Sequence, residues 1–310
     1  MPSALFFDVT LNCMLDCPFC SRKPVKKEEK RMKSLDEFVE VLDRHDVRQV
    51  FFTGGEPLLN ENLCAMIKYA KKRGREVNVQ TNGVLLGSKA EKLKEAGVDG
   101  VFVSIHSHIP ELEYELTGRV MEDVLERKMK GMSVAHSHGL RVFPVTVITS
   151  LNYRILPEMV EHFLARFPWI IHWVFNFIDP AGFTPQELVP KYSDVEPFLL
   201  KALSLLSRKG KNFRVERVPL CYMVEFAEYS TEARRIFTGT KTYGTVREEQ
   251  EFYTDPYWKR EYVRGEACRH CFWKNLCPGI NRRYAEIHGT SEVYPIFSPE
   301  GLLRRRLGED

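Results

Sequence analysis

The sequence predicts an α/β fold, in which a parallel sheet built from repeated strand–helix units is followed by a small cysteine-rich unit. Three observations predict it. Short β-branched and aromatic runs alternate with amphipathic stretches from residue 5 to residue 208. The connections between them are short, which requires parallel strands with right-handed crossovers. After residue 209 the alternation stops, and four of the eight cysteines follow.

The elements of the alternating part can be placed in chain order. Strands are expected at residues 5–10, 49–53, 76–81, 100–106, 141–149 and 170–178. Helices are expected at residues 34–46, 62–73, 89–95, 121–137, 156–167 and 193–208. Ser34 and Glu37 form a capping box that marks the start of the first helix. We expect a first domain of residues 1–212 and a second of residues 213–310, with a strand at 213–218 and a polar loop at 239–250.

The composition limits the class of protein. With 44% hydrophobic and 28% charged residues in 310, the chain is typical of soluble globular proteins. A net charge of +3 gives no case for binding nucleic acid. The start of the sequence does not resemble a signal peptide, and no apolar run reaches the roughly 18 residues of a membrane helix. We therefore expect a cytoplasmic protein, where cysteines are more often metal ligands than disulfides.

Three cysteines stand close together near the start, at Cys13, Cys17 and Cys20. Three thiolates at this spacing can hold three irons of a [4Fe–4S] cluster and leave the fourth iron without a protein ligand. Two alternatives are buried structural cysteines and a zinc site. A zinc site needs a fourth ligand, and the next candidates, His45 and Cys64, lie far along the sequence.

The CxxxCxxC loop follows an apolar strand and has an aromatic residue, Phe19, before its last cysteine. In these features the chain resembles the radical S-adenosylmethionine (SAM) enzymes. That resemblance implies an open (β/α)6 partial TIM barrel and a [4Fe–4S] cluster whose open iron chelates SAM. It implies that SAM is cleaved reductively to a 5′-deoxyadenosyl radical, with a ferredoxin or flavodoxin as electron donor.

Candidate SAM-binding residues follow the predicted strands, since ligands of α/β barrels bind at the carboxyl ends of strands. The GGEP turn at residues 54–57 resembles the family motif that receives the SAM amino group. Relatives with a C-terminal cysteine pattern have an arginine for the SAM carboxylate where this chain has Thr117, so Arg119 is the candidate here. Asn82 before a glycine is also typical of a plain turn. The resemblance assigns SAM or substrate contacts to Phe19, Gly54, Gly55, Glu56, Pro57, Asn82, Ser104, His106, Arg119, Asn152 and Asn176.

A second set of cysteines comprises Cys221, Cys268, Cys271 and Cys277. The CxxCx5C spacing resembles the twitch and SPASM extensions of radical SAM enzymes, which hold auxiliary [4Fe–4S] clusters. The full SPASM pattern has a further cysteine where this chain has Asn281, so one auxiliary cluster is expected. Four cysteines are equally the ligand set of a structural zinc site, and that alternative stays open.

The sequence therefore predicts a radical SAM enzyme that abstracts hydrogen from a C–H bond. Its substrate is a small molecule, or a peptide or protein that is oxidised, cross-linked or matured. Four cysteines would saturate the auxiliary cluster, which argues against the molybdenum-cofactor cyclases of this family, whose auxiliary cluster keeps an open iron. The non-enzyme alternative is a two-cluster iron–sulfur carrier or scaffold, which does not explain the turn at residues 54–57.

Overall fold

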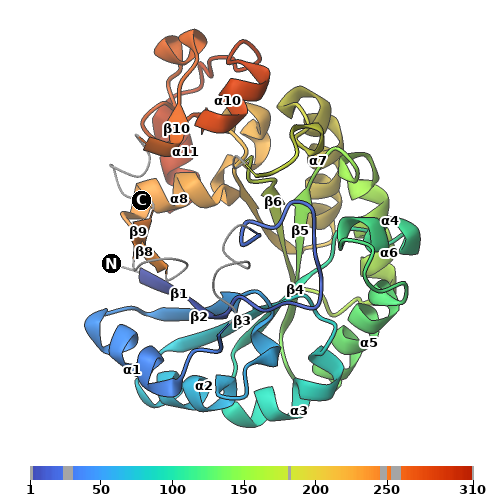
Figure 1. Cartoon of the computed structure of the whole chain (residues 1–310). Coiled ribbons are helices and arrows are strands. Elements are labelled where there is room, and N and C mark those ends of the chain that lie inside the picture. The colour runs from blue at the N-terminus through green and yellow to red at the C-terminus, as the bar shows by residue number, and fades with distance from the viewer. Residues whose placement is uncertain (1–2, 24–30, 181–182, 245–249, 253–259, 309–310) are drawn as a thin grey trace. The chain divides into compact units, whose positions relative to one another are not determined.

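A computed structural model describes residues 3–23, 31–180, 183–244, 250–252 and 260–308 (Figure 1). Contacts within the chain divide it into two compact units. The N-terminal unit comprises residues 2–145 and 241–252, and the C-terminal unit comprises residues 146–240 and 253–310. The functional boundary expected near residue 212 stays a prediction.

The strands of the main sheet are β1 (Ser3–Thr10), β2 (Gln49–Gly54), β3 (Glu76–Thr81), β4 (Gly100–Ser104), β5 (Val142–Ile148), β6 (His172–Phe177), β7 (Asn212–Glu216), β8 (Lys241–Gly244) and β9 (Gln250–Phe252). Their order in the sheet is β7-β6-β5-β4-β3-β2-β1-β8-β9. Consecutive strands from β1 to β7 are neighbours, as in β/α barrels. The strands from β1 to β5 pair in parallel, as do β6 with β7 and β1 with β8, whereas β9 joins β8 antiparallel. The predicted α/β fold is confirmed.

The helices of the N-terminal unit follow its strands in alternation. They are α1 (Leu35–Arg44), α2 (Leu63–Lys72), α3 (Leu86–Ala96), α4 (Pro110–Leu116) and α5 (Val124–Ser137). In Figure 1, α1, α2 and α3 lie along the outer face of the strands of this unit. The predicted capping box is present, because Ser34 N–H donates to the Glu37 carboxylate and Glu37 N–H donates to the Ser34 hydroxyl. The Phe38 ring then packs between Phe7 and Phe52, with centroid distances of 5.1 and 5.0 Å.

The C-terminal unit combines β6 and β7 with helices and a small antiparallel pair of strands. Its elements are α6 (Leu156–Arg166), α7 (Tyr192–Arg208), α8 (Thr231–Thr238), β10 (Tyr262–Val263), β11 (Ile280–Asn281), α10 (Arg282–His288) and α11 (Glu300–Leu307). Buried aromatic rings form its core: Trp173 contacts both Phe163 and Phe175, and its indole N–H donates to Thr146. In the described residues, no helix combines the length and apolar character of a membrane span.

Two expectations about single elements were wrong, and one helix was not expected. Within the polar segment 239–250, residues 241–244 form β8, which pairs with β1, and residues 245–249 lie outside the described residues. Four residues are too few to show a strand period. Helix α4 was not expected. The fourth strand ends at Ser104 rather than at residue 106, because the N–H groups of His106 and Ser107 both donate to the carboxylate of Glu113, at 2.9 and 2.7 Å.

Glu113 on α4 forms an ion pair with Lys128 on α5, and both side chains are fully buried. The Lys128 ammonium lies 2.6 Å from Glu113 Oε1 and also donates to the carbonyl of Ser104. Burial alone would raise the pKa of Glu113, but the charge of Lys128 lowers it below its ordinary value. The pair therefore fixes the end of β4 against two helices.

We expect the Lys128→Met variant to lose roughly 3–5 kcal/mol of unfolding free energy, because it leaves the Glu113 carboxylate buried without its counter-ion. Arg127→Met is the matched control, since Arg127 lies on the same helix and forms an exposed ion pair with Asp123. The control should cost at most about 0.5 kcal/mol. Urea unfolding under anaerobic conditions measures the free energy of unfolding of both variants. Equal decreases in the two variants would contradict the role assigned to the Glu113–Lys128 pair.

Candidate functional site

The loop that carries Cys13, Cys17 and Cys20 begins where β1 ends. All three cysteines are reduced, none of them in a disulfide, and all are partly exposed. The chain turns tightly between the last two, where Cys20 N–H donates to the Cys17 carbonyl at 3.1 Å. At the base of the loop, Thr10 forms an antiparallel bridge with Met32.

This cysteine loop is bound to the turn that follows β2. Gly55 N–H donates to the carbonyl of Thr10, and Glu56 N–H donates to that of Asn12, both at 2.7 Å. A Cβ atom on Gly54 would lie 2.2 Å from the Thr10 oxygen, and one on Gly55 would lie 2.1 Å from the Asn12 oxygen. Gly54 also has a φ of +121°. Only glycine permits this approach of two backbone segments.

The Glu56 carboxylate is completely buried and holds the end of β3. It accepts hydrogen bonds from the Thr81 hydroxyl and the Asn82 N–H, both at 2.7 Å, and from the N–H of Leu58 at 3.0 Å. Burial raises the pKa of Glu56 despite these bonds. Pro57 starts the short turn Pro57–Leu59 beside it. Sequence reasoning assigned this carboxylate to the SAM amino group and did not foresee its internal bonds.

His106 and Phe19 form the part of the site beyond β4. Their rings meet edge to face at a centroid distance of 5.1 Å, and both residues are buried. Burial lowers the pKa of His106 to about 4, so its ring is neutral at pH 7. Ser104, two residues earlier, uses its carbonyl to accept from Lys128. The contact places Phe19, and with it the end of the cysteine loop, against β4.

The cysteine loop has a second attachment, at the end of α4. Asp16 N–H donates to the Thr117 carbonyl at 3.2 Å, and a Cβ on Gly118 would lie 2.3 Å from the Asp16 oxygen. Thr117 is buried, with its hydroxyl donating to the Glu113 carbonyl at 2.7 Å. Arg119 pairs with Glu115 at 3.0 Å, and its side chain is 68% exposed. Sequence reasoning missed Gly118, although a glycine after the position expected to hold arginine was a visible signal.

Comparison with known proteins identifies the family. The pattern of the radical SAM superfamily matches residues 8–166, about half of the chain. The chain belongs to the radical SAM superfamily. The cofactors of this family are a [4Fe–4S] cluster and SAM, and the reduced thiols of the cysteine loop are suitable cluster ligands.

Curated relatives match between half and two thirds of the chain. A probable GTP 3′,8-cyclase of Methanocaldococcus jannaschii is 32% identical over 163 residues, which cover 51% of this chain and 54% of the relative. One from Sulfolobus acidocaldarius is 34% identical over 213 residues, 66% of each chain. The Pyrococcus furiosus tungsten-containing aldehyde ferredoxin oxidoreductase cofactor-modifying protein is 30% identical over 171 residues, 52% of this chain and 48% of the relative. This chain spans about half to two thirds of the length of these relatives.

Solved radical SAM structures match nearly the whole chain. Streptococcus suis SuiB bound to S-adenosylmethionine has a TM-score of 0.68 at 17% identity and covers 96% of this chain and 77% of its own. Native anSMEcpe with bound AdoMet has a TM-score of 0.64 at 17% identity and covers 99% of this chain and 96% of its own. At this identity they show the fold alone, which is the partial TIM barrel expected from the resemblance.

The remaining candidate SAM contacts, Asn152 and Asn176, belong to the C-terminal unit. Asn152 is buried after β5, where its Oδ1 accepts from Thr149 N–H at 2.8 Å and its Nδ2 donates to the Val147 carbonyl at 2.9 Å. These bonds shape the turn after the strand. Asn176 lies near the end of β6, beside Glu216 of β7. All the other candidates lie in the N-terminal unit.

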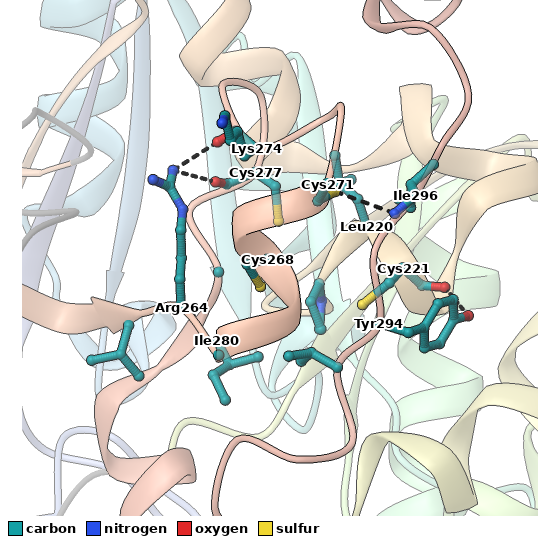
Figure 2. A pocket seen from close by; sticks show the side chains of 15 residues that line it. Leu220, Cys221, Arg264, Cys268, Cys271, Lys274, Cys277, Ile280, Tyr294 and Ile296 are labelled. Carbon is teal, nitrogen blue, oxygen red and sulfur yellow. Dashed lines mark hydrogen bonds between the residues drawn. The ribbon is translucent and has the colours of Figure 1, made fainter.

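The four C-terminal cysteines line one pocket of the C-terminal unit, and Figure 2 shows their side chains turned into it. Burial raises the pKa of Cys221 to about 12 and that of Cys277 to about 11, so a bound cation is needed to stabilise their thiolates. Ile296 N–H points at Cys271 Sγ, 3.4 Å away. Arg264 donates to the carbonyls of Lys274 and Cys277 at 2.7 and 2.9 Å.

Cys221 comes from a part of the sequence distant from the other three cysteines. Its carbonyl accepts a hydrogen bond from the Tyr294 hydroxyl, whose oxygen also lies 3.2 Å from Glu196 Oε1. Its neighbour Tyr222 donates to the Glu292 carbonyl at 2.6 Å. These bonds bring Cys221 to the pocket, and no spacing in the sequence indicated them.

We expect Gly118→Ala to reduce the iron bound by the cysteine loop by about half or more, because the new methyl group overlaps the Asp16 carbonyl and displaces the loop. Gly139→Ala is the matched control. Gly139 also has a positive φ, of +73°, but a Cβ there would meet only the end of the Lys94 side chain. Iron analysis after anaerobic reconstitution compares them; full iron content in Gly118→Ala would contradict the role of this contact.

His106 gives a pH prediction. Its folded pKa of about 4 lies below the ordinary 6.5, so between these values the unfolded chain takes up a proton that the folded chain does not. The free energy of unfolding therefore falls as the pH falls from 7.5 to 5.5. In His106→Leu this decrease should be smaller by roughly 1.3 kcal/mol. The loss from His172, whose pKa burial also lowers to about 4, stays in both proteins.

Urea unfolding at the two pH values measures this difference. His138→Leu, at an exposed histidine, is the control and should keep the pH dependence of the wild type. If His106→Leu keeps that dependence too, the ring is not held neutral by burial.

Proposed function

We propose that Cys13, Cys17 and Cys20 ligate the [4Fe–4S] cluster of this radical SAM enzyme and that SAM binds its open iron. The observation that carries the proposal is the pair of backbone hydrogen bonds between the cysteine loop and the turn at residues 54–57. They hold the start of the cysteine loop, directly before Cys13, against the GGEP turn. Two further N-terminal candidates support it: Asn82 lies 3.6 Å from Cys13 Sγ, and the His106 ring contacts Phe19 of the loop.

We propose that the reaction is hydrogen abstraction from a C–H bond of the substrate. The bound cluster would supply the electron that cleaves SAM to methionine and a 5′-deoxyadenosyl radical, and this radical would take the hydrogen atom from the substrate to give 5′-deoxyadenosine. A ferredoxin or flavodoxin would supply that electron to the cluster. The protein itself would hold the strand ends around the site in place. Glu56 and Glu113 are buried carboxylates that accept hydrogen bonds from backbone N–H groups at the ends of β2, β3 and β4.

We propose that residues 213–310 form a twitch-like domain with one auxiliary [4Fe–4S] cluster. Four free thiols around one apolar pocket support this proposal. A zinc ion binds its thiolate ligands at a Zn–S distance of about 2.3 Å, so the four sulfur atoms lie close together. A four-iron cluster binds each thiolate at a different iron and holds the four sulfur atoms farther apart.

The comparisons support two candidate substrate classes. The cyclase relatives favour a small molecule such as a nucleotide, but their similarity covers only about half to two thirds of the chain. Structures that match almost the whole chain include SuiB bound to the precursor peptide SuiA and anSMEcpe bound to a peptide. Four cysteines would leave no open iron in the auxiliary cluster, unlike the cyclases of this family, so we favour the peptide or protein class. Formation of 5′-deoxyadenosine at a rate that GTP does not stimulate would support that choice.

After anaerobic reconstitution we expect about eight irons per chain, from two four-iron clusters. Changing Cys13, Cys17 and Cys20 together to alanine should remove about half of the iron and abolish SAM cleavage. Changing Cys268 and Cys271 to alanine should remove the other half and leave SAM cleavage at least partly intact. Each variant is the control for the other.

Metal analysis and 5′-deoxyadenosine formation with dithionite measure the two effects. Full iron content in the triple variant would overturn the assignment of the first cluster. One zinc and only four irons per wild-type chain would replace the auxiliary cluster by a structural zinc site.

A further inference from the structure

The side-chain amide of Asn82 contacts two sulfur atoms of the cysteine loop, those of Cys13 and Met14. Its Nδ2 is 3.6 Å from Cys13 Sγ and 3.0 Å from the sulfur of Met14. Its Oδ1 accepts a hydrogen bond from the N–H of Val84 at 2.9 Å. Because the N–H of Val84 can only donate, the oxygen must face it, and the NH2 group must therefore face the sulfurs.

The backbone of Asn82 is held in the same network as the cysteine loop. Its N–H donates to the buried Glu56 carboxylate at 2.7 Å, and the N–H of Glu56 donates to the carbonyl of Asn12, also at 2.7 Å. Asn12 precedes Cys13 in the chain, so these bonds and the Asn82–Cys13 contact close a ring. The position of the amide relative to the thiol is thus fixed by buried bonds and not by a mobile surface side chain.

Hydrogen bonds to the sulfurs of an iron–sulfur cluster raise its reduction potential, because they stabilise the more negative reduced form. A thiolate is also a better acceptor than the thiol. We propose that Asn82 is a positioning residue that orients Cys13 and raises the reduction potential of the N-terminal cluster. This inference rests on the proposed ligation by Cys13, Cys17 and Cys20, and it assigns Asn82 to the cluster in addition to SAM or substrate.

The test removes the donor and keeps the turn. In Asn82→Ser the hydroxyl can still accept from the N–H two residues later, but it is too short to reach the sulfur. Asn82→Asp is the second variant, since it retains the shape and the acceptor and lacks the NH2 group. Asn62→Ser is the matched control, because Asn62 is exposed at the start of α2 and makes no side-chain capping bond.

The measurement is a redox titration of the SAM-free protein, followed by electron paramagnetic resonance. The N-terminal cluster is recognised as the signal that changes when SAM is added to a parallel sample. We expect its midpoint potential to shift negative in Asn82→Ser and further negative in Asn82→Asp, which adds a negative charge. Asn62→Ser should match the wild type, and all three variants should keep full iron content.

An unchanged or more positive potential in Asn82→Ser overturns the proposal. If that variant loses the cluster, Asn82→Asp is measured in its place, and loss of the cluster in both also overturns it, because a tuning residue leaves the cluster assembled. Failure of the ligation itself gives a different result. In that case the triple cysteine variant keeps its iron, whatever the potential of the Asn82 variants.

Discussion

The site depends on the buried carboxylate of Glu56. Its two oxygens accept three hydrogen bonds from the end of β3 and from the turn after β2, while its own N–H binds the cysteine loop. A buried carboxylate is costly unless its acceptor sites are satisfied, so the surrounding groups are held in one arrangement. The start of the cysteine loop thereby acquires a defined place at the end of β2.

A second buried carboxylate acts in the same way on the other side of the cysteine loop. Glu113 accepts hydrogen bonds from the N–H groups of His106 and Ser107 after β4 and forms an ion pair with Lys128. The helix that carries it ends at Leu116, and the loop is attached at Thr117, directly after it. The loop is therefore bound at Asn12 and at Asp16, on both sides of Cys13. Two attachments restrict where the thiols can be before any iron is bound.

Much of this could be predicted from local sequence patterns. Periodicity located six strands and six helices, and cysteine spacing together with the GGEP turn indicated the family. Long-range pairs left no such pattern: Glu113 and Lys128 are an acid and a base among many until α4 and α5 pack together. Tyr294 and Cys221 are 73 residues apart. The four-residue β8 is a strand because it pairs with β1, and β1 is too distant in the sequence for a local pattern to indicate this pairing.

The central claim is that three thiolates leave one iron of the N-terminal cluster to SAM. Electron–nuclear double resonance on the reduced protein, with SAM labelled with ¹⁵N in its amino group, tests this most directly. A strong hyperfine coupling to the labelled nitrogen is predicted, because the nitrogen would be bonded to iron. Bound SAM without such a coupling would mean that the cluster has no open iron, and would contradict the account.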